Sequence, residues 1–315
     1  MRGVIAGIDI GGTNTDFGLV ADGEVIWQER LPTKRYPDVR VLMNTIQQII
    51  QLQLDQQDLK LLGVGIGAPN ANFHTGCMES PPNLPWKGLI NLKEMVHQRF
   101  GVPVVVNNDA NASALGELKY GAGKNMKDFI VITLGTGIGA GIIVNGQLLI
   151  GHDGMAGEVG HTLAIPEGRL CNCGRKGCFE RYASATGLKE TITELLARPG
   201  ATSSLQHIDP ANLTSKQVFE AAQQGDEIAL KAFDYTAAII GRKMAEIAAY
   251  FSPEAIFFLG GLANAGDLLL KPAKDYMEEF VLYLYKDKIP LLVSALPDNK
   301  ASILGAAAAV EEFTH

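Results

Sequence analysis

The stretch VIAGIDIGGTNTDFGLVADGEVIWQERL, residues 4–31, contains three β-strand patterns joined by two tight turns. Residues 11–13, Gly-Gly-Thr, form the first turn, and Asp22-Gly23 forms the second. Two-residue hairpins prefer Asp-Gly, because their central positions need positive φ. The stretch therefore predicts an antiparallel meander of three strands.

The same pattern returns in the second half as FIVITLGTGIGAGIIVNGQLLI, residues 129–150. A glycine turn at 135–137 again follows the first strand, and Asn145-Gly146 supplies the second tight turn. The chain thus contains a structural repeat, and each half opens with a meander.

Amphipathic helices and apolar strands follow each meander and predict a mixed α/β architecture. The expected helices are 41–54, 91–101, 110–123, 227–251 and 301–313, and the expected strands are 61–68, 102–106, 253–261 and 290–297. We expect two similar lobes with a ligand cleft between them. The small N-terminal lobe would comprise residues 1–108 with the C-terminal helix 301–315, and the large lobe residues 109–300.

The composition is that of a globular protein. The chain has 315 residues, 47% of them hydrophobic, and a formal charge of −7. Its lysines and arginines are scattered and form no basic stripe, which argues against a nucleic-acid partner. The apolar run at the start of the sequence is too short for a signal peptide, and no apolar run reaches the length needed to cross a bilayer. We therefore expect a cytoplasmic protein without membrane contact, in which cysteines serve as ligands or free thiols and Cys77 is a bystander.

One histidine and three cysteines occur at metal-ligand spacing in EVGHTLAIPEGRLCNCGRKGCFE, residues 158–180. His161, Cys171, Cys173 and Cys178 suffice to close a tetrahedral Zn²⁺ site with no position left for a substrate water. Such a site is structural. The alternative is a reduced cysteine loop without metal.

The two glycine turns are candidate phosphate-binding segments. Gly11, Gly12 and Thr13 in the first turn, and Gly135, Thr136 and Gly137 in the second, could direct backbone N–H groups at one polyphosphate. Neither turn has the Walker A or Rossmann pattern, and either alone could be a plain turn.

Two further segments suggest nucleotide contacts. Asp9 precedes the first turn and could hold Mg²⁺ through water, or cap the turn. Gly260 and Gly261 follow an apolar strand and could let an adenosine approach the backbone closely.

Polar residues follow the apolar strand 102–106 abruptly, as Asn107, Asn108 and Asp109. Ligands meet α/β sheets where strands end. Asp109 would act there as a general base that accepts a hydroxyl proton during attack on a γ-phosphate, with Asn108 orienting the substrate; alternatively, it is the N-cap of the next helix. Asn83 lies in a proline-stiffened loop and is either a substrate contact or an ordinary turn residue.

Glu158, His161 and Glu180 add carboxylates and an imidazole, the groups that pair with sugar hydroxyls. Zinc at one ring nitrogen of His161 would leave the other free for a substrate hydroxyl. For Glu158 and Glu180 the alternative is a solvated surface charge.

Five motifs together resemble the ROK family, especially its bacterial glucokinases. They are DIGGTNTDFGLV (9–20), NNDANA (107–112), LGTGIGAG (134–141), GEVGH (157–161) and CNCGRKGCFE (171–180). The resemblance implies an actin-like, ribonuclease-H-like fold and ATP-dependent phosphorylation of a hexose, usually at the 6-hydroxyl. It also implies sugar contacts at Asn83, Asn108, Asp109, Glu158, His161 and Glu180, with Asp109 as base, and a homodimer or homotetramer.

The resemblance leaves the sugar and one alternative function open. After GVGIGAP the family often continues with glycine and proline, whereas Asn70, Ala71, Asn72 and Phe73 follow here. Glucose, mannose, fructose and N-acetylmannosamine remain candidate substrates. A sugar-responsive transcription regulator of the same family is a second hypothesis, disfavoured because the first strand begins at about residue 4 with no helix-turn-helix before it. A chaperone-type ATPase is a third, which the zinc motif and the polar cluster disfavour.

Overall fold

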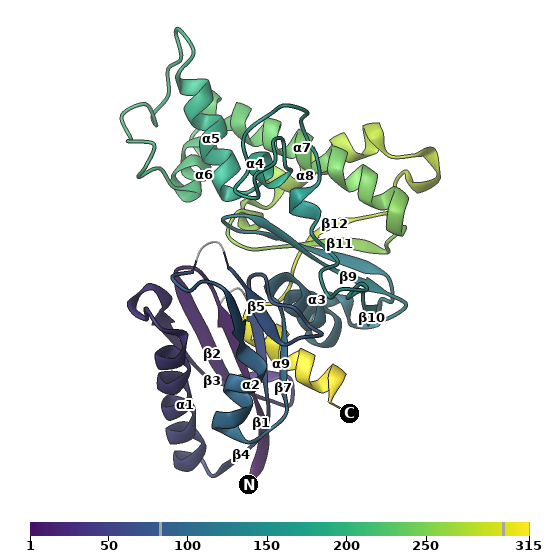
Figure 1. Ribbon diagram of the computed structural model, residues 1–315. Coiled ribbons are helices and arrows are strands. Elements are labelled where there is room, and N and C mark those ends of the chain that lie inside the picture. Colours follow the sequence, from purple (N-terminus) through teal and green to yellow (C-terminus); the bar gives the residue numbers. More distant parts are fainter. Residues whose placement is uncertain (82–83, 298–299, 315) are drawn as a thin grey trace. The chain divides into compact units, whose positions relative to one another are not determined.

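The computed structural model describes residues 1–81, 84–297 and 300–314 (Figure 1). Contacts within the chain divide it into two compact units. The first unit comprises Met1–Lys127, Gly141–Gly157 and Ala295–His315, and the second comprises Asp128–Ala140 and Glu158–Ser294. This division places the helix that starts at Asp109 in the first unit; the lobe boundaries expected from the sequence assign it to the second and remain a prediction.

The first unit contains a five-stranded sheet in the order β3-β2-β1-β4-β7. β1 pairs antiparallel with β2 and β2 with β3, as the meander predicts, while β4 and β7 add in parallel. A hairpin of β5 and β6 accompanies the sheet. Its elements are β1 (Arg2–Ile10), β2 (Asn14–Ala21), β3 (Glu24–Pro32), α1 (Val39–Gln56), β4 (Leu59–Ala68), β5 (Cys77–Glu79), β6 (Leu89–Asn91), α2 (Leu92–Phe100), β7 (Val104–Asn108), α3 (Asp109–Tyr120) and α9 (Ala301–Phe313).

The two faces of this sheet are covered differently. Even-numbered residues of β1, such as Ile8, join the apolar core that α1 and α2 complete. The opposite face carries glycines, because α9 packs directly on the strand backbones. A Cβ at Gly7 would lie 2.2 Å from the carbonyl oxygen of Ile303, and one at Gly65 1.8 Å from that of Ala306. Asp9, two residues after Gly7 on β1, shares this α9-covered face.

The second five-stranded sheet has the order β10-β9-β8-β11-β12. β8 and β12 pair in parallel with β11, and β9 and β10 form an antiparallel hairpin. Asn145 and Gly146 take positive φ of 52° and 76° in that hairpin, as the Asn-Gly pair predicts. The strands are β8 (Phe129–Leu134), β9 (Ile138–Val144), β10 (Gln147–Leu148), β11 (Ala255–Leu259) and β12 (Leu291–Val293).

The second unit contains several helices that the sequence did not predict. The unit contains α4 (Glu180–Ala183), α5 (Ala185–Leu196), α6 (Ser215–Gln223), α7 (Glu227–Phe251) and α8 (Asp267–Phe280). Only α7 was expected, and with these bounds. A capping box between Thr214 and Gln217 marks the start of α6 and was a usable sequence signal. α8 carries Pro272 in its second turn, which weakens its helical pattern.

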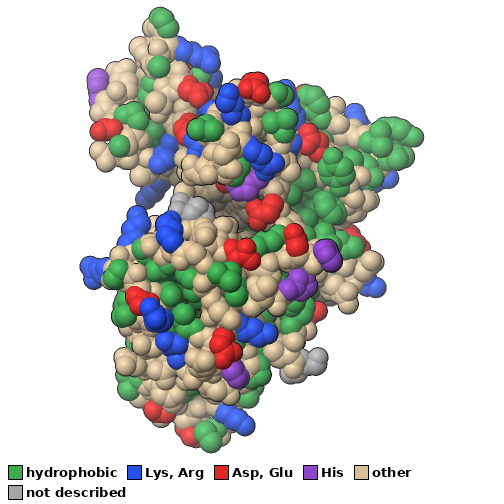
Figure 2. Space-filling model, viewed as in Figure 1, with side chains coloured by type: hydrophobic (Ala, Val, Ile, Leu, Met, Phe, Trp, Pro, Cys, Tyr) green, Lys and Arg blue, Asp and Glu red, His purple; other side chains and the backbone are tan. Residues whose placement is uncertain are grey.

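Exposed apolar residues lie at the end of α8 and directly after it. Phe280, Leu282, Tyr283 and Leu284 are all at least 49% exposed, and Figure 2 shows apolar side chains gathered on the right of the second unit. Contiguous apolar surface is typical of protein contact sites. The expected homodimer or homotetramer remains a prediction.

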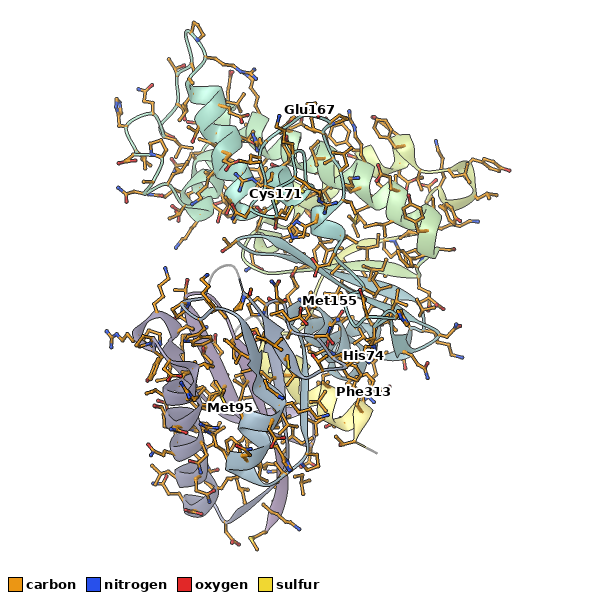
Figure 3. All side chains as sticks on the ribbon, in the orientation of Figure 1. His74, Met95, Met155, Glu167, Cys171 and Phe313 are labelled. Carbon is orange, nitrogen blue, oxygen red and sulfur yellow. The ribbon has the colours of Figure 1, made fainter. Side chains whose placement is uncertain are left out.

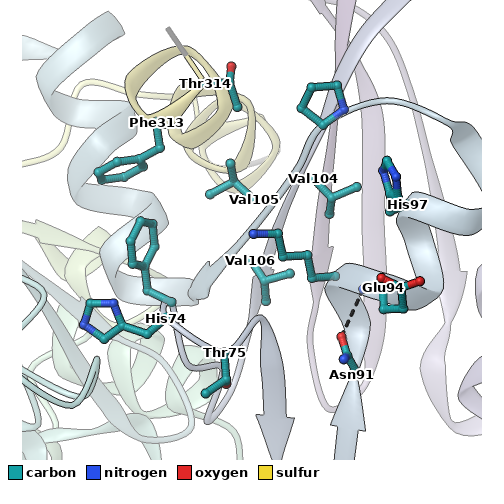
Figure 4. A pocket seen from close by; sticks show the side chains of 13 residues that line it. His74, Thr75, Asn91, Glu94, His97, Val104, Val105, Val106, Phe313 and Thr314 are labelled. Atoms are coloured by element: carbon teal, nitrogen blue, oxygen red, sulfur yellow. Dashed lines mark hydrogen bonds between the residues drawn. The ribbon is translucent and has the colours of Figure 1, made fainter.

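A pocket of about 640 Å³ opens in the first unit along β7. His97 of α2 and Phe313 of α9 lie on opposite sides of it (Figure 4). It contains none of the candidate site residues.

The structure confirms the α/β class, with a mixed five-stranded sheet and flanking helices in each half of the chain. In the part of the chain that the structure describes, no helix combines the length and apolar character needed to cross a membrane.

Candidate functional site

The first glycine turn joins β1 and β2 and is held by Thr33, the residue that follows β3. The Gly11 N–H donates to the Asn14 carbonyl at 2.9 Å, which closes the turn. The buried Thr33 donates its hydroxyl to the Gly11 carbonyl at 2.8 Å, and its N–H to the Thr13 carbonyl at 3.0 Å. The Gly11 N–H is therefore occupied, and phosphate contacts would fall to the following residues, Gly12 and Thr13.

Asp9 lies beside the N-terminus of α3. It stands opposite Asp16 on β2 and Gly67 on β4. A Cβ at Gly67 would lie 3.6 Å from both Asp9 Oδ1 and the Cα of Asp109. Burial, and then the nearby Asp109 carboxylate, raise the pKa of Asp9 from 3.8 to about 7, although a hydrogen bond from Ser302 of α9 lowers it. The ionised form of Asp9 is therefore destabilised in this position, and a bound cation would stabilise it.

We expect Asp9→Asn to stabilise the metal-free protein above neutral pH. A folded-state pKa raised above 3.8 means that protonation stabilises the fold below pH 4 and that this stability is lost as pH rises through about 7. The full difference corresponds to about 4 kcal/mol, and partial exposure of Asp9 reduces the expected gain to about 1–3 kcal/mol.

The measurement is urea unfolding of both proteins without Mg²⁺ or nucleotide at pH 4.5 and pH 8. The gain should appear at pH 8 and shrink at pH 4.5. An equal difference at both pH values would contradict a perturbed Asp9.

The polar run at the end of β7 and the start of α3 contains buried structural residues and residues accessible to ligands. Asn107 and Asn111 are buried, and the Asn111 amide donates to Asn107 Oδ1 at 3.1 Å. Asn108, not Asp109, is the N-cap of α3, since its Oδ1 accepts the Ala110 N–H at 2.9 Å.

Asp109 is the first residue of α3, and its Oδ1 also accepts the Ala110 N–H, at 2.8 Å. Its side chain is accessible to water. Desolvation by the surrounding protein raises its pKa, while the hydrogen bond that it accepts from the Ala110 N–H opposes that shift. A reachable carboxylate with a raised pKa suits a general base. Asn83 lies outside the described residues.

The structure brings His161, Cys171, Cys173 and Cys178 of the second unit together, with one donor atom from each within 4.8 Å of the others. Cys171 Sγ lies 3.6 Å from His161 Nδ1, and Cys173 Sγ lies 3.6 Å from Cys178 Sγ. A tetrahedral Zn²⁺ with ordinary bond lengths separates its sulfur and nitrogen donors by about 3.5–3.8 Å. The donor set and its spacing therefore fit zinc. Figure 3 shows Cys171 in this loop.

The chemistry of the thiols also suits a cation. Burial, followed by a hydrogen bond with Glu180, raises the pKa of Cys171, whose thiol is shielded from water. The pKa of Cys173 falls to about 6, because hydrogen bonds from Arg175 outweigh the opposing effect of burial. Gly174 and Gly177 take positive φ of 87° and 78° in the loop.

Glu158 and Glu180 lie beside His161 at the edge of this cluster. His161 Nδ1 faces Cys171 and lies 3.7 Å from Glu180 Oε1, while its Nε2 lies 3.9 Å from Glu158 Oε2. Glu180 Oε1 also lies 3.0 Å from Cys171 Sγ. The imidazole therefore turns one nitrogen to the thiols and the other to the more exposed Glu158.

Glu180 also touches the second glycine turn. A Cβ at Gly137 would lie 2.6 Å from Glu180 Oε2. The Gly135 N–H donates to the Gly137 carbonyl at 3.1 Å, which closes this turn as Gly11 closes the first. Thr136 is exposed beside it.

The two glycines after β11 differ in role. Gly260 has φ of 104°, and a Cβ there would lie 2.8 Å from the Leu134 carbonyl, so the packing of β11 beside β8 requires it. A Cβ at Gly261 would meet no atom within 4 Å. Only Gly261 thus offers open backbone to a ligand.

Two residues beyond the predicted set shape these surroundings. Ser302 hydrogen-bonds to Asp9 from the start of α9; its position as a polar residue in an apolar helix was the available signal. Asn72 is buried; its amide donates to the Asp153 carbonyl at 2.8 Å, and its Oδ1 accepts the His74 N–H at 3.0 Å. The unusual loop after β4 is thus tied to the segment that precedes Glu158.

Two similar halves with glycine turns and a Cys₃His loop are together typical of one family of proteins. The chain belongs to this family, the ROK family, whose sequence pattern it matches over residues 5–312. Two similar members of the family are glucokinases. The glucokinase of Halalkalibacterium halodurans is 37% identical over 95% of this chain and 92% of its own length. The structure of a ROK family glucokinase from Streptomyces griseus in complex with glucose and AMPPNP superposes with a TM-score of 0.84, at 33% identity over 98% of this chain and 99% of that one.

The family also contains regulators. The xylose repressor of Caldicellulosiruptor bescii is 32% identical over 98% of this chain, but this covers only 78% of the repressor's own length. The kinase matches confirm the actin-like fold class and support a sugar kinase; the repressor matches leave the specificity open.

Proposed function

We propose that the chain is an ATP-dependent hexose kinase that phosphorylates the 6-hydroxyl of glucose. The observation that carries the proposal is Asp109, a water-accessible carboxylate with a raised pKa at the N-terminus of α3 and beside Asp9. Glucokinases at 33–37% identity, matched over nearly the whole chain, support the choice of glucose.

In the proposed reaction Asp109 accepts the proton of the 6-hydroxyl as that oxygen attacks the γ-phosphorus of ATP. The new O–P bond forms as the bond to the β,γ-bridging oxygen breaks, and ADP leaves. Asn108, whose Oδ1 caps α3, holds its amide beside the base and orients the sugar. Asn83 is a further proposed sugar contact.

The proposed contacts on the second unit are Glu158, His161 and Glu180. Carboxylates accept hydrogen bonds from sugar hydroxyls, and the Nε2 of His161, turned away from the thiols, is the nitrogen left for one. When bound by His161, Cys171, Cys173 and Cys178, Zn²⁺ would fix this loop and have no part in phosphoryl transfer.

The proposed nucleotide contacts are the two glycine turns and the segment after β11. Gly12 and Thr13, with Thr136 and Gly137, would bind the phosphates, while Gly11 and Gly135 close the two turns through their own N–H groups. Gly261 would let the adenosine approach the backbone, and Gly260 allows the close packing that places it there. When bound beside Asp9, Mg²⁺ would neutralise phosphate charge.

The test is a coupled ATP-consumption assay that compares kcat/KM for glucose, mannose, fructose, N-acetylmannosamine and N-acetylglucosamine. We expect kcat/KM for glucose to exceed that of each other sugar by at least about 10-fold, because each of them alters a hydroxyl that the polar groups of the proposed site would otherwise pair with. A higher kcat/KM for N-acetylmannosamine than for glucose would change the proposed substrate but retain the proposed kinase activity. Absence of phosphorylation together with sequence-specific DNA binding would favour the regulator.

A further inference from the structure

Arg169 lies nearly buried in the loop that carries the Cys₃His cluster, and all its side-chain donors are hydrogen-bonded. It lies two residues before Cys171, and its side chain is 11% exposed. Its backbone N–H donates to the hydroxyl of Tyr182 at 2.6 Å, and its guanidinium lies over the Tyr182 ring at 4.7 Å from the centroid. Arg169 therefore belongs to the loop by sequence and to the surface of α4 by contact.

All five guanidinium N–H groups of Arg169 have an acceptor. Nε and Nη2 donate to the two carboxylate oxygens of Glu194 at 2.8 and 2.7 Å. Nη1 donates to the carbonyls of Arg181 and Gly187 at 2.7 and 3.1 Å, and Nη2 also donates to Thr191 Oγ1 at 2.9 Å. One side chain thus binds α4 through Arg181 and α5 through the other three partners.

The junction of α4 and α5 needs such an anchor. α4 has only four residues, and no side chain caps its N-terminus. Gly187 packs so closely on α4 that a Cβ there would lie 2.7 Å from the Tyr182 carbonyl carbon. The Arg181 carbonyl that Arg169 satisfies is next in sequence to Glu180.

This junction contacts both ligand-facing segments of the second unit. Glu180 Oε1 lies 3.0 Å from Cys171 Sγ. The Ala185 N–H donates to the Gly135 carbonyl at 2.9 Å, and Thr186 Oγ1 donates to the Thr136 carbonyl at 2.8 Å. A shift of the junction would move the carboxylate of Glu180 and the second glycine turn together.

We propose that Arg169 is a positioning residue that locks the α4–α5 junction and thereby sets both Glu180 and the glycine turn at 135–137. Its effect on ligands rests on the proposed sugar and nucleotide sites, whereas its effect on the junction does not. Lysine cannot replace it, because an ammonium has three donors and no planar fork for Glu194 and the two carbonyls.

The test compares Arg169→Lys with the wild type in four measurements: metal content, amide hydrogen exchange, and the Kd values of glucose alone and of a non-hydrolysable ATP analogue alone. We expect the metal to stay at its wild-type level. Exchange across residues 181–187 should speed up at least about 10-fold, and both Kd values should rise about 10-fold, as with other partners that orient binding groups. Saturated turnover should change less than about threefold, because the base is untouched.

Arg198→Lys is the matched control, since Arg198 is exposed just beyond the end of α5, and it should match the wild type throughout. Glu194→Gln keeps the test valid if Arg169→Lys unfolds. Glu194 is 58% exposed, and its replacement removes one charged partner of Arg169, so smaller shifts in the same direction are expected.

Unchanged exchange at residues 181–187 would overturn the anchor. Faster exchange with unchanged Kd values would overturn its link to the ligands, and a loss of affinity that appears only with loss of metal would assign the effect to the metal. If the wild type binds neither ligand, the proposed function fails, while the exchange data still decide whether Arg169 holds the junction.

Discussion

Asp109→Asn lowers the turnover of sugar phosphorylation by about 10²–10⁴-fold, the range that a positioned general base contributes. Asparagine has the same size and keeps an oxygen that can accept the Ala110 N–H, which Asp109 Oδ1 accepts at 2.8 Å. Folding and sugar affinity should therefore persist, with the Kd of glucose within about threefold of the wild type. Turnover from steady-state kinetics and Kd from calorimetry measure the two effects separately.

Asp267→Asn is the matched control, because Asp267 is the first residue of α8 as Asp109 is of α3. It should leave turnover unchanged. In the wild type the base works only when deprotonated, and its pKa is raised above 3.8, so kcat/KM should rise with pH through that raised value. Unchanged turnover in Asp109→Asn would remove the base from the mechanism.

Cys178→Ser abolishes metal binding and weakens sugar affinity about 10–100-fold, the usual effect when groups that orient a binding site are lost. The wild type, purified without chelators, should contain about one zinc ion per chain, because four donors close a tetrahedral site. Metal analysis and calorimetry with glucose test both statements. Replacement of zinc by Co²⁺, which also accepts tetrahedral ligation, should leave turnover within about threefold, since the metal would order the loop without touching the phosphoryl group.

Cys77→Ser is the control for cysteine chemistry. Cys77 is buried like Cys178, but it belongs to the first unit and lies outside the Cys₃His cluster. Its replacement should retain the metal and the sugar affinity. Metal-free wild-type protein with full sugar affinity would refute the zinc proposal.

The repeated meanders were predictable because their signals are local. Gly-rich turns, Asp-Gly and Asn-Gly fix φ at single positions, and the strands between them alternate on a short period. The same holds for the Cys₃His cluster, whose spacing brings its members together once the loop folds. The bounds of α7 also followed from its long apolar period.

Contacts between distant segments were not predictable in this way. Ser302 reaches Asp9 from the other end of the chain, and Arg169 finds its acceptors on residues 181–194. No sequence pattern around these two residues indicates which residues they will hydrogen-bond to. The helices α4, α5, α6 and α8 were missed. α4 has only four residues, and Pro272 interrupts the helical pattern of α8, whereas the capping box at Thr214 was an available signal for α6.

The bare face of the first sheet has a consequence for synthesis. β1 and β4 lie within the first 68 residues, yet the helix that packs on Gly7 and Gly65 begins at Ala301. During translation the nascent sheet must wait for almost the whole chain before this face is covered. The first unit therefore completes its core last, although it begins first, and one face of its sheet stays uncovered until α9 has been made.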